Sequence, residues 1–163
     1  MNKLQVYEFL DNQNIWYEKT EHEAVFNMQE LSEIVIPYPE ADAKNLFVRD
    51  DKRQNYYLIS VKGNKRVNLK DFRRKLQTRP LTFASPEDLM GILGLIPGAV
   101  SPLGVLNDKN HIVKVFLDKE FIDNLIGIHP NDNTATVCLK TTDLITIIKN
   151  CGNFVDFVDV DNV

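Results

Sequence analysis

The part of the chain whose residue types best suit chemistry is a loop rich in glycine and proline, residues 94–104. Its three glycines permit a positive φ and let a ligand approach the backbone, whereas its two prolines fix the chain and donate no N–H. Such a loop can direct several backbone amides at one oxygen, where they stabilise the negative charge that develops on a carbonyl during ester hydrolysis. The loop therefore indicates acyl or ester chemistry, and a simple connecting turn is the alternative.

Two side chains elsewhere could assist at a carbonyl. Lys44 precedes an apolar run, from which its ammonium can polarise a carbonyl oxygen, although a plain surface lysine is the alternative. His129 precedes Pro130, which favours an extended backbone, and an imidazole there can donate to a substrate, act as a base or cap a turn. His22 lies between two glutamates, but consecutive residues do not converge on one ion, so we expect no metal site there.

Several familiar motifs are missing. The sequence contains no H-E-x-x-H, no P-loop and no G-x-S-x-G, so the usual signatures of zinc proteases, nucleotide hydrolases and serine hydrolases are excluded. Cys138 and Cys151 form no C-x-x-C, which argues against structural zinc and favours a reducing compartment. The N-terminus has no apolar signal segment, and no window is long enough to span a membrane. We therefore expect a cytoplasmic protein that does not bind membranes.

Charge is distributed unevenly along the chain. The net charge is -4, yet residues 62–79 contain eight basic residues and a single acid, Asp71. A basic patch on an otherwise acidic protein can bind a phosphate backbone locally while the rest of the surface repels it. A solvated helix face explains the same pattern, and the sequence leaves both explanations open.

The 163 residues are expected to form one domain, residues 1–163, large enough to bury its own core. Helical spacing and capping signals predict helices at residues 2–13, after Asn27, at 67–76, from Ser85 to Gly94, at 119–123 and at 141–150. Strand patterns occur at residues 15–20, 44–50 and 56–62, on both sides of a turn at 107–110, and at 134–140 and 154–158. Short strands with scattered helices predict an α+β fold with a curved, mixed sheet.

Three segments, taken in order, carry a resemblance to a known family. They are Lys-Asn-Leu-Phe-Val-Arg-Asp at 44–50, Gly-Ala-Val-Ser-Pro at 98–102 and Gly-Ile-His-Pro at 127–130. They are similar to the K-N-L-F-L-x-D strand, the G-x-x-x-P loop and the G-x-H-P turn of YbaK/EbsC-type prolyl-tRNA editing domains. The chain looks closest to the free-standing alanyl-tRNA(Pro) deacylases, from its first helix to Phe157. The resemblance implies a YbaK-like domain whose curved sheet is partly barrel-like.

The family resemblance implies a hydrolase that acts in trans on mischarged Ala-tRNA(Pro). A synthetase pocket built for proline cannot strongly exclude the smaller alanine, because a methylene changes binding by only about 1–3 kcal/mol. A second pocket too small for proline restores the discrimination. Cys-tRNA(Pro) remains an alternative substrate. A non-catalytic role, in which the cleft senses an amino acid or a tRNA end, is an alternative to hydrolysis.

The resemblance also assigns roles to particular residues. Amides of the loop from Gly98 and Ala99 to Pro102 receive the aminoacyl carbonyl, and Pro102 borders the substrate pocket. Lys44 holds the ester end with Asn45 nearby, and His129 lines the amino-acid pocket. No protein nucleophile is evident, so the resemblance implies attack by water, assisted by the terminal ribose hydroxyl of the tRNA. Candidate pocket walls are Val25, Phe26 and Met28.

The partners implied are the acceptor end of tRNA(Pro) and its mischarged aminoacyl form, whereas direct binding of prolyl-tRNA synthetase is left open. No cofactor and no metal is implied. The basic segment could contact the acceptor stem, a prediction that depends on charge alone. The residues predicted to do so are Lys65, Arg66, Lys70, Arg73 and Arg74.

Overall fold

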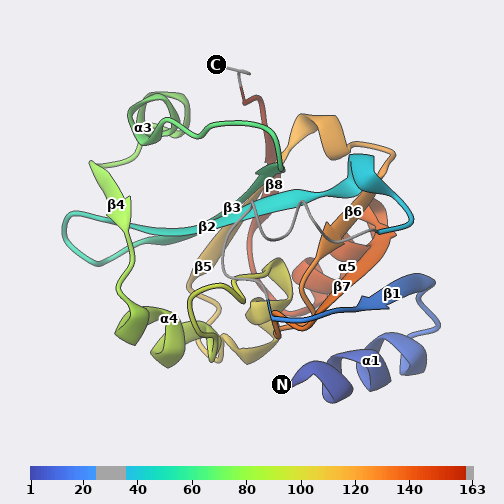
Figure 1. Ribbon diagram of the computed structural model, residues 1–163. Helices are drawn as coiled ribbons and strands as arrows, with labels where there is room; N and C mark the ends of the chain where they lie inside the picture. Colours follow the sequence, from blue (N-terminus) through green and yellow to red (C-terminus); the bar gives the residue numbers. More distant parts are fainter. Residues whose placement is uncertain (25–35, 161–163) are drawn as a thin grey trace.

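The computed structural model describes residues 1–24 and 36–160, and its strands form two sheets (Figure 1). The larger sheet has the order β4-β2-β3-β5-β8 and the smaller the order β1-β7-β6. The strands of the larger sheet are β2 (Ala43–Asp50), β3 (Tyr56–Lys62), β4 (Leu81–Phe83), β5 (Val113–Asp118) and β8 (Val155–Val158). Those of the smaller are β1 (Tyr17–Glu21), β6 (Leu125–Ile128) and β7 (Ala135–Lys140).

The larger sheet is mixed, as the sequence predicted. β2 pairs antiparallel with both β3 and β4, whereas β3, β5 and β8 run parallel. The smaller sheet is antiparallel throughout. The α+β prediction is therefore confirmed, with two sheets in place of one and no closed barrel among the described strands. An isolated bridge between Asp42 and Gly127 joins β6 of the smaller sheet to the start of β2.

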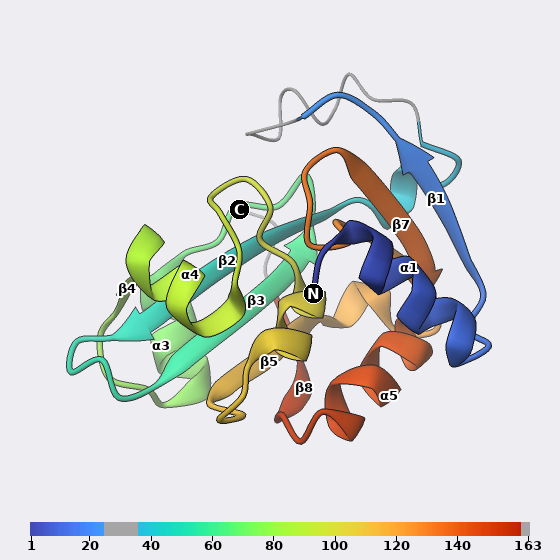
Figure 2. The ribbon, with the colours of Figure 1, turned by 90° about the horizontal axis from the view of Figure 1, so that it is seen from below.

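Helices cover both faces of the larger sheet. They are α1 (Lys3–Asn12), α3 (Leu69–Leu76), α4 (Pro86–Leu93) and α5 (Thr141–Asn150), with short 3-10 turns η1 (Pro39–Ala41), η2 (Pro102–Asn107) and η3 (Lys119–Phe121). Figure 1 shows α3 on one face, and Figure 2, seen from below, shows α1, α4 and α5 on the other. No helix in residues 1–24 and 36–160 has the length and apolarity that a bilayer crossing requires.

The two faces of the larger sheet bury separate hydrophobic clusters. Alternate residues of β3 point to opposite faces, so Leu58 joins the larger cluster and Ile59 the smaller. We call the face with the smaller cluster the α3 side, because Phe72 of α3 packs there. We call the opposite face the loop side, because Leu95 and Leu103 of the loop 94–104 pack there.

The helix that leads into the glycine-rich loop begins and ends as its sequence predicted. The Ser85 hydroxyl accepts a 3.0 Å hydrogen bond from the Asp88 amide, and Pro86 occupies the first helical position. At the other end Gly94 adopts φ +65°, and its amide donates to the Met90 carbonyl. These caps fix the point at which the loop leaves the helix.

Residues 105–117 were predicted as two strands, and this prediction is wrong for the first of them. Residues 102–107 form η2, and β5 begins only at Val113. Pro102 starts this turn, and Gly104 packs so closely that an added Cβ would lie 2.8 Å from Leu95 Cδ1. Strands β4 and β6, of three and four residues, were not predicted. The helix predicted after Asn27 lies outside the described residues.

Candidate active site

The turn that contains His129 meets β2 at the Asp42–Gly127 bridge. Space is limited here, because an added Cβ at position 127 would lie 3.4 Å from both the Ala41 carbonyl oxygen and Cys138 Sγ. The two chain segments run in the same direction at the bridge. Lys44 and His129 each follow it by two residues, so the bridge brings these two segments of the predicted site to one place.

The structure holds His129 as a neutral imidazole with one nitrogen engaged. Its Nδ1 lies 2.8 Å from the Ala135 carbonyl oxygen, and since a carbonyl only accepts, Nδ1 carries the proton. Burial, and to a lesser extent the neighbouring His22 ring, lowers the pKa of His129 below its ordinary value. Within the described chain Nε2 makes no hydrogen bond. It is therefore available to accept one from a substrate.

One amide of the loop is hydrogen-bonded within the loop itself. The Ala99 amide donates to the Ile96 carbonyl at 3.0 Å across a turn in which Gly98 adopts φ +91°. This corrects the prediction for Ala99, whose amide is used within the turn and is buried. Pro102 has no N–H and is itself buried.

Within residues 98–102, three amides remain without a partner in the part of the chain that the structure describes, those of Gly98, Val100 and Ser101. The Ser101 hydroxyl is buried and accepts a 3.2 Å hydrogen bond from the Leu103 amide, which fixes the loop where it enters η2. The array of donors predicted for the loop is thus reduced to these three positions.

Asn131 ties the His129 turn to the loop. Its Nδ2 donates to the Leu103 carbonyl at 3.4 Å and to the Met1 carbonyl at 3.2 Å. Asn131 adopts φ +61°, a conformation that asparagine tolerates better than most residues. The sequence analysis did not select this residue, although its place directly after the Gly-x-His-Pro turn was a usable signal. The bridge and Asn131 together join the three motifs into one region.

Asn45 and Lys44 lie on opposite faces of β2. Asn45 pairs with Ser60, whose buried hydroxyl donates a 2.6 Å hydrogen bond to Asn45 Oδ1, and both point to the loop side. Lys44 pairs with Val61, which belongs to the α3 side. The Lys44 ammonium has no ion pair or hydrogen bond with any described residue. No sequence motif points to Ser60, because only the strand register brings it to Asn45.

The edge of β2 between these two faces is open between its bridge to β6 at Asp42 and its pairing with β4. β4 pairs with β2 only from Val48 to Asp50, so residues 43–46 have no strand on that edge within the described ranges. A group at this edge can be approached from both faces. The predicted pocket walls Val25, Phe26 and Met28 lie outside the described residues.

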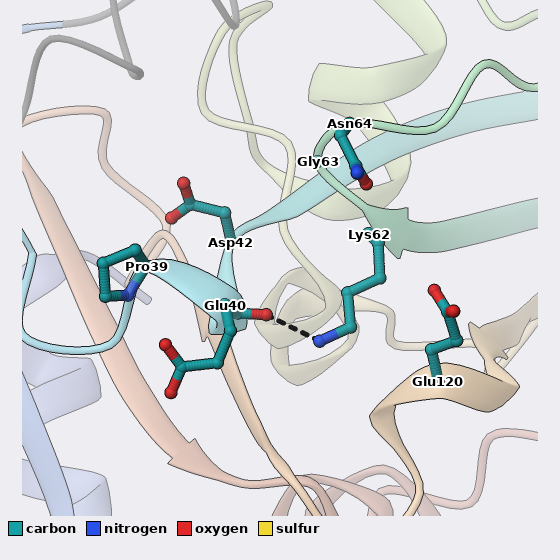
Figure 3. Close-up of a pocket in the computed structure, with 7 residues that line it drawn as sticks. All are labelled: Pro39, Glu40, Asp42, Lys62, Gly63, Asn64 and Glu120. Carbon is teal, nitrogen blue, oxygen red and sulfur yellow. Dashed lines mark hydrogen bonds between the residues drawn. The ribbon is translucent and has the colours of Figure 1, made fainter. Parts of the chain in front are cut away.

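A separate hollow of about 520 Å³ lies where β2 begins and β3 ends (Figure 3). Figure 3 shows the Lys62 ammonium turned toward Glu40, to whose carbonyl it donates at 2.6 Å. Burial, with Glu40 nearby, raises the pKa of Asp42. Because Glu40, Asp42 and Glu120 supply three carboxylates against the single ammonium of Lys62, this hollow does not suit a phosphate.

The prediction that Lys65 contacts tRNA needs correction. Its side chain is 5% exposed, and its ammonium lies 2.9 Å from carboxylate oxygens of both Asp118 and Glu120. Burial alone would lower the pKa of Lys65, but the hydrogen bonds that its ammonium donates to Asp118 and Glu120 raise it. Nζ also donates to the Val160 carbonyl at 2.9 Å. Lys65 therefore stabilises the fold and does not face a ligand.

The other predicted basic residues are exposed on the α3 side of the protein. Phe72 anchors α3 to the sheet and leaves the charged side chains in solvent. Arg74 forms an ion pair with Asp71 on the same helix. The predicted tRNA contacts that are exposed are Arg66, Lys70, Arg73 and Arg74.

No group of three or more metal-binding side chains occurs in residues 1–24 and 36–160. His22 uses both ring nitrogens for the protein itself, with Nδ1 2.8 Å from the Glu23 carbonyl oxygen and Nε2 3.0 Å from Thr136 Oγ1. The site as described is thus built from backbone amides, an asparagine, a lysine and a neutral histidine.

Known proteins resemble this chain in sequence. Residues 22–147 match the model of the aminoacyl-tRNA editing domain. The chain is 40% identical over 145 residues to the prolyl-tRNA editing protein ProX of Acetoanaerobium sticklandii, covering 88% of each chain. It is 31% identical over 141 residues to the prolyl-tRNA synthetase associated domain-containing protein 1 of Bos taurus, covering 83% of this chain and 82% of that one.

A solved structure described as a candidate trans-editing enzyme for prolyl-tRNA synthetase has a TM-score of 0.74 to this chain. The match covers 100% of this chain and 99% of the other at 18% identity, and it shows a common fold. The matches in sequence confirm the family that the three motifs predicted. The chain therefore belongs to the aminoacyl-tRNA editing domain family.

Proposed function

We propose that this protein hydrolyses the ester bond of mischarged Ala-tRNA(Pro) after prolyl-tRNA synthetase has released it, with the whole chain acting as one domain. The observation that carries the proposal is the junction of the three motifs, made by the Asp42–Gly127 bridge and by Asn131. A related protein, ProX, is named for prolyl-tRNA editing, which supports the class of substrate.

In this proposal the loop and β2 hold the reacting ester. The unpartnered amides of Gly98, Val100 and Ser101 receive the carbonyl oxygen as it gains negative charge. Asn45, fixed by Ser60, contacts the substrate from the loop side. Lys44 approaches across the open edge of β2 and holds the ribose end of the ester.

The attacking group in this proposal is water, assisted by the neighbouring ribose hydroxyl. The described nucleophiles near the junction are unsuited to attack. Cys138 is buried, and burial raises its pKa to about 11, so its thiol stays protonated at neutral pH. The buried Ser101 hydroxyl accepts from the backbone and has no histidine bonded to it.

In this proposal His129 binds the amino-acid part of the substrate. A neutral imidazole does not repel the positively charged α-ammonium of the substrate, and its free Nε2 can accept a hydrogen bond from that group. Val25, Phe26, Met28 and Pro102 are proposed as the walls that exclude proline by size. Alanine and cysteine differ by one sulfur atom, so these walls would decide between them.

The test is a deacylation panel with purified protein and tRNA(Pro) charged with alanine, cysteine, serine or proline. We expect loss of Ala-tRNA(Pro) well above the spontaneous rate and no loss of Pro-tRNA(Pro). Faster hydrolysis of Cys-tRNA(Pro) would assign cysteine as the substrate. If none of the four esters is hydrolysed above background, the hydrolase proposal is wrong.

A further inference from the structure

One aromatic side chain is left in solvent on the edge of the larger sheet. Phe83 is 60% exposed, although it is the last residue of β4. It pairs directly with Val48, which is fully buried in the cluster of the α3 side. Paired residues of an antiparallel ladder point to the same face. The Phe83 ring therefore stands on the α3 side, at the edge, with most of its surface in water.

Lys44 stands on the same face and along the same edge. It pairs with Val61, which also belongs to the α3 side. Lys44 and Val48 are four residues apart on β2, a span of roughly 13 Å at the usual rise of a strand. Between them the outer edge of β2 has no strand in the described part of the chain until Val48 meets β4. Phe83 and Lys44 thus mark the two ends of one open strand edge.

A helix rich in basic residues lies next to the strand that carries Phe83. α3 packs against β4, and Figure 1 shows β4 descending from it. Exposed basic side chains on α3 and in the segment before it include Arg66, Lys70, Arg73 and Arg74. Single-stranded nucleic acids are bound by this combination, in which cations follow the phosphates and aromatic rings stack on bases. A protein partner would instead favour several adjoining apolar side chains with charges at the rim.

We propose that Phe83 stacks on a base of the unpaired 3′ end of the tRNA and that the exposed cations of α3 contact the adjoining phosphates. The proposal rests on the proposed function, because it takes Lys44 as the residue that holds the terminal ribose. The strand edge from Lys44 to Phe83 then guides the 3′ end, with the ester at Lys44 and an upstream base at Phe83.

The test compares two substrates that differ in the presence of that upstream base. One is Ala-tRNA(Pro), and the other is alanyl-adenosine, which carries the same ester on the terminal nucleoside alone. Because stacking contributes about 1–3 kcal/mol per base, we expect F83A to raise KM for Ala-tRNA(Pro) about tenfold or more, with little change in kcat. Hydrolysis of alanyl-adenosine should be unchanged, and F83W should retain the wild-type KM.

A matched control is available on the same sheet. Phe154 is another half-exposed phenylalanine, next to β8 at the far edge, and F154A should leave both substrates unaffected. If F83A lowers hydrolysis of both substrates equally, or changes neither, the stacking role is wrong. An effect of F83A on self-association alone would likewise overturn it in favour of a protein contact.

Failure of the hydrolase proposal can be separated from failure of this one. If the wild-type protein hydrolyses neither ester, binding of an uncharged oligonucleotide with the sequence of the tRNA(Pro) 3′ end can be measured by fluorescence anisotropy. We expect F83A to weaken this binding about tenfold and F154A to leave it unchanged. Equal affinities for wild type and F83A would overturn the inference.

Discussion

The two faces of the larger sheet differ in chemistry along a single strand. On the loop side β2 presents Asn45, which Ser60 holds in place next to a loop with three unpartnered amides. On the α3 side it presents Lys44, with the basic helix α3 over the same face. The first set of groups suits a neutral carbonyl, and the second suits phosphate and ribose. Adjacent residues of one strand can therefore serve the two ends of one substrate.

The largest effect is expected from replacing Lys65, and it is an effect on stability. It tests whether the lysines on the α3 side differ in what they contribute to the fold. Lys65→Met leaves the buried Asp118 carboxylate without its partner, so we expect a loss of about 3–5 kcal/mol in the free energy of unfolding. Lys70→Met, on the exposed face of α3, should change stability by less than about 0.5 kcal/mol. Urea denaturation measures both. Equal stability of the two variants would contradict the structural role of Lys65.

Lys44 tests whether the α3 side takes part in the reaction at all. If its ammonium holds the ester, we expect Lys44→Ala to lower kcat/KM for Ala-tRNA(Pro) by about 100-fold, the usual effect of removing one such group. Lys114→Ala is the control, because Lys114 is an exposed lysine on β5. Single-turnover deacylation measures both. If Lys44→Ala weakens tRNA binding and leaves the deacylation rate unchanged, the protein is a binder and its chemistry lies elsewhere.

Variants of Asn45 and Ser60 test whether the loop side contributes to the reaction rate. Removing Asn45 with Asn45→Ala should lower kcat about fivefold, since one hydrogen bond contributes about 1 kcal/mol. Ser60→Ala should act in the same direction but more weakly, because it only loosens Asn45. The double variant should be no slower than Asn45→Ala alone. Additive losses of rate would mean that Ser60 does not work through Asn45.

The smallest effect is expected from pH. Because the pKa of His129 is lowered in the folded protein, activity should be constant near neutral pH and fall only below about 6.5, where the imidazole begins to gain a charge beside the substrate ammonium. In the unfolded chain the same group takes up its proton at higher pH, so stability should also decrease as the pH falls below this value.

Two variants identify the group responsible for this pH dependence. His129→Asn should remove most of the loss of activity at low pH, because asparagine does not titrate. His22→Asn should keep that loss, although His22 faces His129 at a ring distance of 6.3 Å. The nearby Asp132 carboxylate titrates at lower pH, since the hydrogen bond from Thr134 lowers its pKa. A rate profile that His129→Asn leaves unchanged would exclude His129 as the sensor.

The sequence was informative where structure depends on local signals. The helix from Pro86 follows from Ser85 and Gly94, and the hairpin of β2 and β3 follows from two apolar runs around a polar turn. Strands β4 and β6 were missed because they are short and exist only through pairing with distant strands. The turn η2 was taken for a strand because Val105 and Leu106 have strand-like side chains, whereas Pro102 and the packing of Gly104 decide the outcome.

The site was predicted in its parts but not in its contacts. Three short motifs located Lys44, the loop and His129, yet they could not indicate that Asn131 links two of them. The Gly–Pro composition predicted free amides, but the turn that uses the Ala99 amide depends on backbone geometry. In the basic segment, only the contact with Asp118, far away in the sequence, distinguishes Lys65 from its neighbours.

The segment that carries His129 and the segment that carries Lys44 meet at Gly127, a residue without a side chain. Position 127 touches the Ala41 carbonyl and Cys138 at distances that an ordinary Cβ barely fits. Replacing Gly127 with alanine would fill the remaining space between these neighbours, and a larger side chain would have to displace one of them. An engineer who wished to change the substrate range could therefore vary the size of this side chain, because it lies between the segment that carries His129 and the segment that carries Lys44.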